Sequence, residues 1–447
     1  MEKRRDFVKK MAITTAGIAI GNKLSAMSAK SYRNIIGAND RIYTAVIGIN
    51  GRGGSMCGTF AKQSNTRVSV LCDVDTRTFA KAIKTVTDAG QADAPRTEGD
   101  CRKLLEDKHI DAIYIATPDH WHAPLTIMGC QAGKNVYVEK PLSHNPHEGQ
   151  LAVAAARKYN KVVQMGAQRR SVPVLIQAID QLHKGLIGRV YFAKAWYTNN
   201  RKATYLKPGT VPAELNYDLW QGPAPRLAYQ DGLIHYNWHW FWHWGTGEAL
   251  NNGTHEVDVA RWGLGVDFPS HVTSIGGRYQ FKDDWQTPDT QVIAMDFPDR
   301  KSLMWESRSS NGRKIEGSDR GVIFYGDNGS LDTDGDGYKV YDPDGKLINE
   351  VAPTMNQAIQ GRNTTSPGVE WDSLHIANFL DAIRNNTRPS CDVEIGYKSI
   401  LGMQLGNIAW RVGRDLKIDP QTGFILNDPE AQKLWSRTYE PGWEPKV

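Results

Sequence analysis

A glycine-rich turn early in the chain has the composition to bind the phosphates of a dinucleotide. The segment from Gly48 to Gly54 reads Gly-Ile-Asn-Gly-Arg-Gly-Gly, after a β-branched run and before a helix-like segment. Glycines let the backbone turn tightly and approach a pyrophosphate, while the helix N-terminus offers amide donors and a positive dipole end. The predicted cofactor contacts in this turn are Gly48, Asn50, Gly51, Arg52 and Gly53.

Asp73 follows the next predicted strand, where a dinucleotide site of this kind usually has a carboxylate. It can accept hydrogen bonds from ribose hydroxyls, which favours NAD over NADP. Arg77 lies close enough in the sequence to bind the 2′-phosphate of NADP, so the sequence does not exclude NADP as the cofactor. Asn50 replaces the middle glycine of the usual pattern, and Asn tolerates left-handed backbone better than other non-glycine residues do.

An aromatic segment from His235 to Trp244 reads His-Tyr-Asn-Trp-His-Trp-Phe-Trp-His-Trp. Sugars present apolar C–H faces that stack on aromatic rings, with hydroxyls that bond to polar side chains. The segment is therefore either a substrate wall or a stretch of buried core, and the sequence favours neither. The candidate substrate residues are Trp238, His239, Trp240 and His243, joined by Arg169 and Tyr197 as residues that could reach the same cleft.

The elements that must position these residues alternate between strand-like and helix-like segments from Arg41 onward. This alternation is typical of a parallel sheet with crossover helices, so we expect a Rossmann NAD(P)-binding domain over residues 41–168. The predicted strands are Tyr43–Ile49, Arg67–Cys72, Ala112–Ala116, Asn135–Val138 and Val162–Met165.

The rest of the chain has longer strand-like runs separated by polar turns. We expect residues 169–447 to form an α+β domain for substrate binding and oligomerisation, with a large, mostly antiparallel, open-faced sheet. The predicted strands are Val190–Tyr197, His271–Tyr279, Thr290–Phe297 and Val322–Tyr325, followed by helices over Trp371–Arg384 and Ile395–Arg414.

The N-terminus carries Arg4-Arg5, then a mild apolar run from Met11 to Ile20 and small residues to about Ala29. Residues 1–30 therefore resemble a twin-arginine export signal, which predicts an exported or periplasmic protein that engages the twin-arginine machinery. The apolar run is far shorter than the roughly 20 residues that span a bilayer, so we expect no stable membrane anchor.

The charge of the chain argues against a nucleic-acid partner. Its net charge of +5 arises within residues 1–30, which hold seven Lys/Arg and two Asp/Glu, and the remainder is balanced.

The five cysteines form no CxxC pair, so no zinc site or disulfide framework is expected. The run from Asp332 to Gly337 resembles a calcium loop, but Pro343 replaces the required twelfth-position Glu, which favours a hairpin turn and no metal.

Two later motifs carry a family resemblance. Thr117-Pro118-Asp-His-Trp-His122 follows the third predicted strand, and Glu139-Lys140-Pro141 follows the fourth. Together with the glycine turn and Asp73, they resemble the Gfo/Idh/MocA family of glucose-fructose-oxidoreductase-like and inositol-dehydrogenase-like enzymes, in its exported, sugar-acting branch. The resemblance implies cofactor contacts at Thr117, Pro118, His122, Glu139 and Lys140, and dimers or tetramers.

The same resemblance implies the catalytic residues. The lysine of the Glu-Lys-Pro motif, Lys140, would point at the substrate hydroxyl beside the nicotinamide, with a commonly cis Lys140-Pro141 bond. The family's Asp-x-Gly-x-His element matches Asn251-Asn-Gly-Thr-His255, which makes His255 the general base. Asn251 replaces the family's Asp and is a further candidate substrate residue.

The leading functional hypothesis is an exported NAD(P)-dependent oxidoreductase that oxidises a secondary hydroxyl of a sugar or glycoside, with C3 oxidation to a keto-sugar as one form. Export in the folded state implies a cofactor that is already, and tightly, bound. One alternative is an NAD-dependent glycosidase that works through transient oxidation and elimination. Another is a non-catalytic sugar-binding protein on the same fold.

Overall fold

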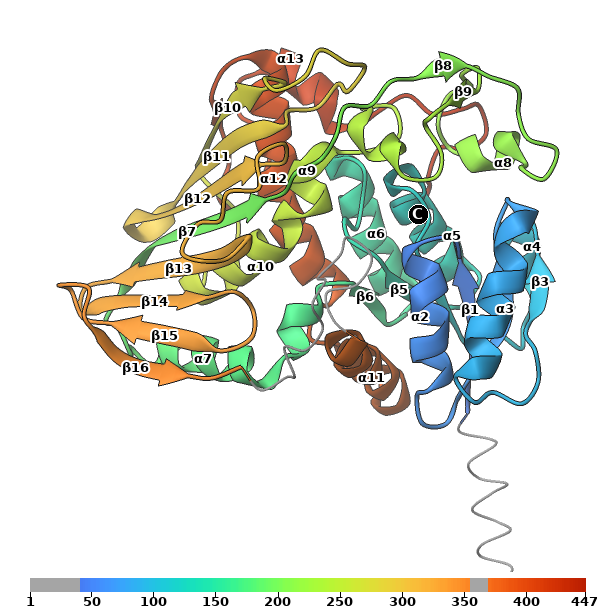
Figure 1. The fold of residues 1–447 in the computed structure, drawn as a ribbon, viewed down its shortest axis with the longest axis horizontal. Coiled ribbons are helices and arrows are strands. Elements are labelled where there is room, and N and C mark those ends of the chain that lie inside the picture. The colour runs from blue at the N-terminus through green and yellow to red at the C-terminus, as the bar shows by residue number, and fades with distance from the viewer. Residues whose placement is uncertain (1–40, 354–368) are drawn as a thin grey trace, which may run out of the picture.

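The computed structural model describes residues 41–353 and 369–447 of the chain (Figure 1). The predicted export signal at residues 1–30 lies outside this part. The first domain is built on a six-stranded sheet of order β3-β2-β1-β4-β5-β6, in which every pair is parallel. Its strands are β1 (Ile42–Ile47), β2 (Thr66–Cys72), β3 (Arg96–Glu98), β4 (Ala112–Ile115), β5 (Asn135–Val138) and β6 (Val163–Met165).

Crossover helices connect these strands, as a parallel sheet requires. They are α2 (Arg52–Ala61), α3 (Phe79–Asp88), α4 (Cys101–Glu106), α5 (Asp119–Gln131) and α6 (Pro146–Lys158), with short turns η1 (Thr76–Thr78) and η2 (Gln168–Ser171). The Rossmann prediction is confirmed, and the five predicted strands lie within two residues of those observed. The sequence analysis missed β3, since its three polar residues carry no β-branched run.

Both faces of this sheet are buried, which explains the continuous apolar strands. On one face, Phe60 of α2 and Val86 of α3 pack against Tyr114 and Tyr137. The same cluster includes Phe379 of helix α11 (Val369–Asn385), which comes from much later in the chain. One face of the Rossmann sheet is therefore covered in part by helix α11, which follows the strands β7 to β16 of the second domain in the sequence (Figure 1).

The second domain contains a nine-stranded sheet of order β16-β15-β14-β13-β7-β12-β11-β10-β17. Every pair is antiparallel except β7 with β12, so the predicted mostly antiparallel sheet is confirmed as a mixed sheet. Its strands are β7 (Val190–Thr198), β10 (His271–Gly277), β11 (Thr290–Phe297), β12 (Lys301–Arg308), β13 (Arg320–Gly326), β14 (Gly329–Thr333), β15 (Tyr338–Tyr341), β16 (Leu347–Val351) and β17 (Leu416–Lys417). The turn η4 (Pro298–Arg300) links β11 and β12.

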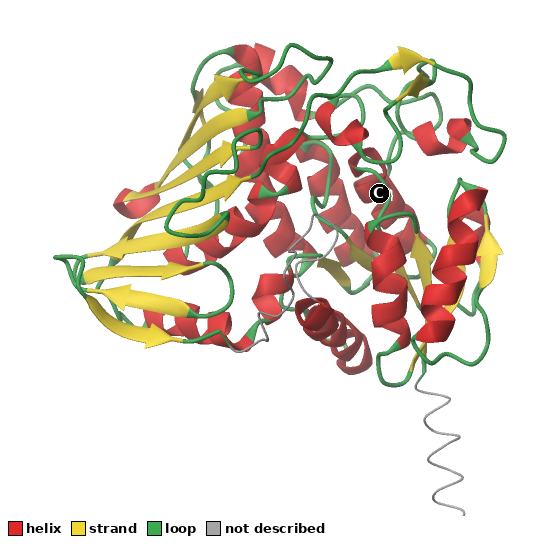
Figure 2. Cartoon of the chain, in the orientation of Figure 1, coloured by secondary structure: helices red, strands yellow, loops and turns green. Residues whose placement is uncertain are grey.

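Helices lie on one side of this sheet, between it and the Rossmann domain (Figure 2). Helix α10 packs mainly on β7, and α12 packs on both β10 and α6, so α12 is buried on nearly all sides. The helices are α7 (Pro173–His183), α9 (Gly247–Asn251), α10 (Gly253–Leu264), α12 (Val393–Val412) and α13 (Pro429–Gln432), with the turn η5 (Lys433–Trp435).

Residues 199–246 leave β7 and run over the Rossmann domain, and we call them the aromatic cover (Figure 1). They form a cluster of their own, built on buried rings such as Trp220, Trp240 and Trp244. The cover contains β8 (Lys207–Pro208), α8 (Tyr217–Gln221), β9 (Gln230–Asp231) and η3 (Asn237–Trp240).

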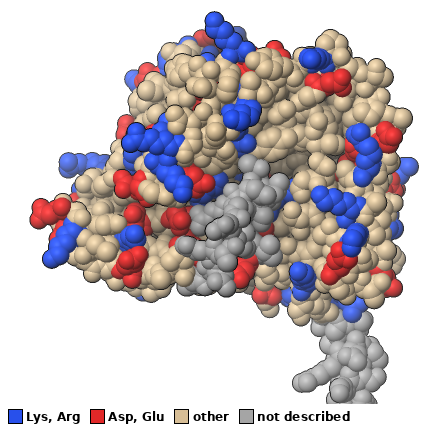
Figure 3. Space-filling model, viewed as in Figure 1, with Lys and Arg blue, Asp and Glu red and all other residues tan. Residues whose placement is uncertain are grey.

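Several smaller features concern the other sequence predictions. The Asp332–Gly337 run forms a hairpin between β14 and β15, as expected. Among residues 41–353 and 369–447, no group of three His, Cys, Asp or Glu side chains is placed to hold a metal, and the five cysteines are free. No helix in the same ranges combines the length and apolarity needed to cross a bilayer. Basic and acidic side chains are interspersed on the face shown in Figure 3.

We predict that helix α11 stabilises the Rossmann domain. Phe379 is fully buried, with its ring centroid 5.7 Å from that of Tyr137. Phe379→Ala should lower the free energy of unfolding by about 3–5 kcal/mol in urea denaturation, because it leaves a cavity under the sheet. Leu374→Ala, on an exposed position of the same helix, should cost less than about 1 kcal/mol. Equal effects of the two substitutions would contradict this account.

Candidate active site

A cavity of about 540 Å³ lies between the two domains and is lined by residues from both. The Rossmann side contributes ten of the predicted cofactor residues: Gly48, Asn50, Gly51, Arg52, Asp73, Thr117, Pro118, His122, Glu139 and Lys140. The second domain contributes five of the predicted substrate or catalytic residues: Arg169, Trp238, His239, Asn251 and His255. The chain thus brings most of the predicted site into one space.

The glycine turn has the geometry of a phosphate cradle. Gly48 has φ +81°, and a Cβ there would lie 2.6 Å from the carbonyl oxygen of Ala116. Gly51 precedes α2 without a side-chain cap, and a Cβ added to it would meet open space. The first amides of α2 are therefore exposed to an anion in the cavity, and the residues present fit a dinucleotide. Helix α2 begins at Arg52, within the glycine-rich turn itself.

Asp73 is held at the end of β2 by two backbone amides. Its Oδ2 accepts a hydrogen bond from Ile49 N at 2.7 Å, and its Oδ1 accepts one from Asp75 N at 3.0 Å. Burial raises the pKa of Asp73, while these two hydrogen bonds oppose the rise. The carboxylate lines the cavity in a fixed orientation, where it can accept from ribose hydroxyls.

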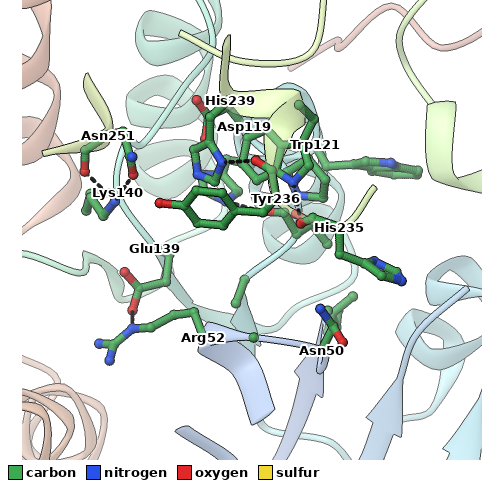
Figure 4. Close-up of a pocket in the computed structure, with 18 of the residues that line it drawn as sticks. Asn50, Arg52, Asp119, Trp121, Glu139, Lys140, His235, Tyr236, His239 and Asn251 are labelled. Atoms are coloured by element: carbon green, nitrogen blue, oxygen red, sulfur yellow. Dashed lines mark hydrogen bonds and ion pairs between the residues drawn. The ribbon is translucent and has the colours of Figure 1, made fainter. Parts of the chain in front are cut away.

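A buried ion triad fixes the start of α2. The Nε of Arg52 donates to Glu139 Oε1 at 2.8 Å (Figure 4), and its two terminal nitrogens bind both oxygens of Asp372 at 2.8 and 2.6 Å. Tyr114 donates to the same Glu139 oxygen at 2.8 Å. Burial would raise the pKa of Glu139, but the charges of Arg52 and Lys140 bring it below its ordinary value. The sequence analysis did not find Asp372, which lies on α11.

Lys140 reaches the cavity from the segment that follows β5. Its Nζ donates to the carbonyl oxygen of Asn251 at 2.5 Å and to Asn251 Oδ1 at 3.0 Å (Figure 4). The Lys140-Pro141 bond is cis, as the family resemblance implied. Burial lowers the pKa of Lys140 from its ordinary value, although Glu139 and Asp119 act in the opposite direction.

His122 braces this loop from α5. Its Nδ1 lies 2.6 Å from the carbonyl oxygen of Pro141, and its Nε2 lies 2.8 Å from that of Thr117. The ring therefore joins the two family motifs and holds Lys140 in the cavity. Although His122 lines the cavity, its polar contacts are with the protein backbone.

Asn251 orients the lysine through a chain of contacts. Its Nδ2 donates to Glu248 Oε1 at 3.3 Å, and Glu248 in turn forms a close ion pair with Arg201 of the aromatic cover. Arg201 also donates to the hydroxyl of Tyr236 at 2.9 Å. The sequence predicted Asn251 as a substrate residue, and its described contacts make it in addition the partner of Lys140.

His255 lies in the first turn of α10 and lines the same cavity. Burial lowers its pKa well below the ordinary value, and the charges of Lys140, Arg169 and Arg320 lower it further. The ring is therefore neutral near pH 7 and has a nitrogen lone pair to accept a proton. This is the protonation state that a general base requires.

A second imidazole, His239, faces the cavity from η3. Its Nδ1 lies 2.6 Å from the carbonyl oxygen of Tyr236, which can only accept, so Nδ1 carries the hydrogen. Its ring stacks on Trp238 with centroids 3.6 Å apart. Burial lowers its pKa well below the ordinary value, so its Nε2 is an acceptor. The sequence analysis named His239 only as a substrate contact.

Four predicted site residues are not among those lining the cavity, and each has a packing role. A Cβ on Gly53 would lie 1.8 Å from the carbonyl oxygen of Gly48, so Gly53 permits α2 to pack on the turn. Tyr197 lies beneath the guanidinium of Arg320. Trp240 stacks on a neighbouring ring at 4.0 Å, and His243 Nε2 lies 2.8 Å from the carbonyl oxygen of Pro225. The aromatic segment is thus partly site and partly core.

The aromatic cover is attached to the loop after β2, beside Asp73. Asn216 N donates to the carbonyl oxygen of Val74 at 2.8 Å, and Thr76 N donates to that of Glu214 at 3.0 Å. His235, which lines the cavity, places Nε2 2.8 Å from Asp75 Oδ2. These contacts hold the cover over the end of the cavity where Asp73 lies.

Two family models match the chain. The first, described as an oxidoreductase family with an NAD-binding Rossmann fold, matches residues 42–167. The second, described as the C-terminal alpha/beta domain of the same oxidoreductase family, matches residues 191–445. The matched segments coincide with the two sheets described above.

Curated relatives are similar over part of the chain. A glycosyl hydrolase family 109 protein of Saccharopolyspora erythraea is 26% identical over 208 residues, which are 43% of this chain and 45% of that protein. Oxidoreductase P35 of Formosa agariphila is 33% identical over 103 residues, 23% of this chain and 32% of that protein. The chain thus spans less than half the length of either relative.

Solved structures share the fold over most of the chain. Levoglucosan dehydrogenase in complex with NADH and levoglucosan has a TM-score of 0.66 at 18% identity, covering 84% of this chain and 99% of its own. Aldose-aldose oxidoreductase from Caulobacter crescentus, complexed with glycerol, has a TM-score of 0.62 at 17% identity, covering 85% of this chain and 100% of its own.

We predict that the buried imidazole of His120 makes the fold sensitive to acid. His120 is fully buried beside Trp220 and Trp244, and burial lowers its pKa well below the ordinary 6.5. Below pH 6.5 the unfolded chain binds a proton that the folded chain excludes, so the free energy of unfolding falls as the pH falls.

Urea denaturation between pH 7.5 and 4.5 measures this effect. His120→Gln should flatten the slope by up to about 1.4 kcal/mol for each pH unit, the contribution of one proton. His109→Gln, at an exposed position, serves as the control and should leave the slope unchanged. A slope that is the same in all three proteins would refute the assignment to His120.

Proposed function

The chain belongs to the GFO_IDH_MocA family of oxidoreductases, and on that premise we propose that it transfers a hydride between NAD and the carbon that bears a secondary hydroxyl of a sugar or glycoside. One observation carries the proposal. Lys140 from the first domain and His255 from the second line the same cavity as the glycine turn. This arrangement places a cation and a neutral base together where a dinucleotide and a polyol can meet.

The residues that would hold the dinucleotide are the turn from Gly48 to Arg52 and the carboxylate of Asp73. Bound NAD supplies the hydride acceptor for the carbon that is oxidised. The protein's part is to remove the hydroxyl proton and to stabilise the negative charge that develops on the oxygen. The neutral ring of His255 accepts the proton, and the ammonium of Lys140, oriented by Asn251, stabilises the alkoxide.

We propose that the product is a keto-sugar, with C3 as one position that is oxidised. The aromatic ring of Trp238 and the imidazole of His239 line the cavity and suit the apolar face and hydroxyls of a sugar ring. The matches to levoglucosan dehydrogenase and to aldose-aldose oxidoreductase support a sugar-sized polyol in a shared fold.

A second candidate function is a redox-neutral glycosidase. The similarity to glycosyl hydrolase family 109 proteins favours it, and so does the second imidazole, His239, on the cavity wall. Transient oxidation of a ring hydroxyl would acidify the adjacent C–H. One imidazole could then remove that proton while the aglycone departs, water would add across the double bond that this elimination leaves, and the returning hydride would reduce the keto group again.

We propose that the dinucleotide is tightly bound. The aromatic cover is bonded to Val74 and Asp75, directly beside Asp73, so exchange of the dinucleotide at this end requires those contacts to open.

We further propose export through the twin-arginine route, supported by Arg4-Arg5 and the short apolar run that follows.

We also propose that the chain assembles as a dimer or tetramer through the outer face of the nine-stranded sheet. The rings of Phe192 and Tyr325 stack on neighbouring strands of this sheet with centroids 5.7 Å apart. Both side chains keep some solvent exposure, as do Met304 and Lys194 on the same face. Light scattering coupled to size-exclusion chromatography measures the assembly, and a monomeric mass would contradict this proposal.

The enzymatic proposal is tested by purifying the protein without added cofactor and identifying any retained dinucleotide. Its nicotinamide absorbance is then followed against a panel of neutral and acidic glycosides. Lys140→Met and His255→Asn should each lower kcat/KM by about 10²–10⁴-fold, whereas Lys81→Met, on the exposed side of α3, should not.

Because its pKa is lowered, His255 should lose its function as base only below pH 6.5, so the acid limb of the pH profile of kcat/KM should lie at a lower pH than that of an ordinary histidine.

The products decide between the two candidate functions. A keto-sugar with a reduced cofactor supports the oxidoreductase. Released aglycone, unchanged cofactor and solvent deuterium at the adjacent carbon support the glycosidase. Retained dinucleotide with neither redox change nor products across the panel would exclude both and favour a sugar-binding protein.

The export proposal predicts the fate of the N-terminus in a host with a twin-arginine system. Replacing Arg4 and Arg5 together with Lys should keep the precursor in the cytoplasm, because the machinery reads the arginine pair. Immunoblots of cytoplasmic and exported fractions measure the shift. The same distribution for the parent and the double variant would contradict the export signal.

A further inference from the structure

The cavity has a cationic wall on the side of the nine-stranded sheet, formed by Arg169 and Arg320. Arg169 comes from η2, directly after the Rossmann sheet, and Arg320 begins β13. Their side chains are 5% and 13% exposed. Neither the cofactor nor the catalytic pair used above requires a guanidinium at this wall.

The carboxylate of Glu256 lies next to both arginines but closer to one of them. Glu256 is fully buried in the first turn of α10, and Arg169 Nη1 binds its Oε1 at 2.7 Å. Arg320 Nη1 reaches the same oxygen only at 3.8 Å, beyond hydrogen-bond distance. Glu256 therefore hydrogen-bonds to Arg169 and not to Arg320. Burial lowers the pKa of Arg320, and the charge of Glu256 is the largest influence that raises it.

The hydrogen bond and the ring contact of Arg320 are with neutral groups, although the charges of Asp319 and Glu248 also act on its guanidinium. Its Nη2 donates to Asn252 Oδ1 at 3.2 Å, and its guanidinium lies 4.8 Å from the ring centroid of Tyr197. Its Nε is buried without a hydrogen-bond partner among the described residues. Its Nη1, which lies beyond hydrogen-bond distance of Glu256, is not among the fully buried atoms, so an acceptor in the cavity can reach Nη1 and complete the hydrogen bonding of Arg320.

The local field agrees with this geometry. The charges that most lower the pKa of His255, after burial, are those of Lys140, Arg169, Arg320 and Arg52. Arg52 is neutralised by Glu139 and Asp372. Arg169 is likewise paired with Glu256, so the positive field beside His255 comes mainly from Lys140 and Arg320.

The dinucleotide phosphates do not account for this wall. Their cradle is the glycine turn and the N-terminus of α2, in the Rossmann domain. Arg320 instead belongs to the sheet of the second domain and bonds to Asn252, three residues before His255. An anion at Arg320 would thus belong to the molecule whose hydroxyl faces His255.

We propose that the sugar taken by this cavity carries an anionic substituent, a carboxylate as in a uronic acid, which Arg320 binds beside the reacting hydroxyl. This inference rests on the proposed function, because it takes a sugar as the ligand. Sulfate and phosphate esters share the same hydrogen-bonding chemistry with guanidinium, and the experiment separates these sources. A neutral sugar offers hydroxyl oxygens as acceptors but no charge to pair with the guanidinium, so the site should favour the anionic sugar.

The test compares matched glycosides on the purified holoprotein. Calorimetry gives Kd for methyl β-D-glucuronide and methyl β-D-glucoside, for the corresponding galacto pair, and for glucose 6-sulfate and glucose 6-phosphate. The uronides should bind about 10- to 100-fold more tightly than the neutral glycosides, the range of one charge-assisted interaction. The ratio of kcat/KM for each pair is measured beside the ratio of Kd.

Variants at Arg320 show whether this residue carries the preference. Arg320→Gln keeps a polar side chain without the charge and should reduce the Kd ratio to within about 3-fold, while Arg320→Lys should retain part of it. Arg313→Gln removes a charge from an exposed position before β13 and should leave the ratio unchanged. Thermal unfolding verifies that each variant is folded.

Each outcome separates this inference from the proposed function. Equal binding of neutral and acidic glycosides overturns the anionic substrate, and oxidation of the neutral sugar then leaves the oxidoreductase proposal standing. A preference for the uronide that Arg320→Gln abolishes supports the inference even if neither sugar is oxidised, a result that counts against the oxidoreductase alone. If a sulfate or phosphate ester binds more tightly than the uronides, the carboxylate is overturned as the anionic group and the ester takes its place. No binding of any sugar overturns both proposals.

Discussion

The buried ion triad of Arg52, Glu139 and Asp372 joins three parts of the molecule on which the cavity depends. Arg52 starts the helix after the glycine turn, Glu139 precedes the cavity lysine, and Asp372 belongs to the returning helix α11. Removing Arg52 would take the shared cation away from two buried carboxylates, which costs far more than the loss of a surface pair. The cradle for the phosphates and the loop of Lys140 are thus held by one set of contacts.

The same principle of compensated burial extends across the cavity. Lys140 is held by the oxygens of Asn251, while Glu248 links Asn251 to Arg201 in the aromatic cover. The two imidazoles, His239 and His255, remain neutral because burial disfavours their charged forms. The cavity therefore combines fixed cations with neutral bases, an arrangement suited to removing a proton from a hydroxyl.

Much of this could be predicted from the sequence, because it depends on local patterns. The glycine turn, Asp73, Lys140 and His255 each belong to short motifs at the ends of predicted elements, and the structure places all four on one cavity. Asp372 could not be found in this way, because its partner Arg52 is 320 positions distant and α11 reads as an ordinary amphipathic helix. The aromatic segment has one composition but two environments, and only packing assigns Trp238 to the cavity and Trp240 to the core.

The return of α11 has a consequence for synthesis on the ribosome. The last Rossmann strand ends at residue 165, but the helix that covers one face of its sheet begins at residue 369. At ordinary elongation rates the intervening stretch of roughly 200 residues takes about 10–40 s to translate. Throughout that interval the nascent domain presents Tyr137 and its neighbours to water or to a chaperone, so the first domain to emerge reaches its native packing only when nearly all of the chain has been made.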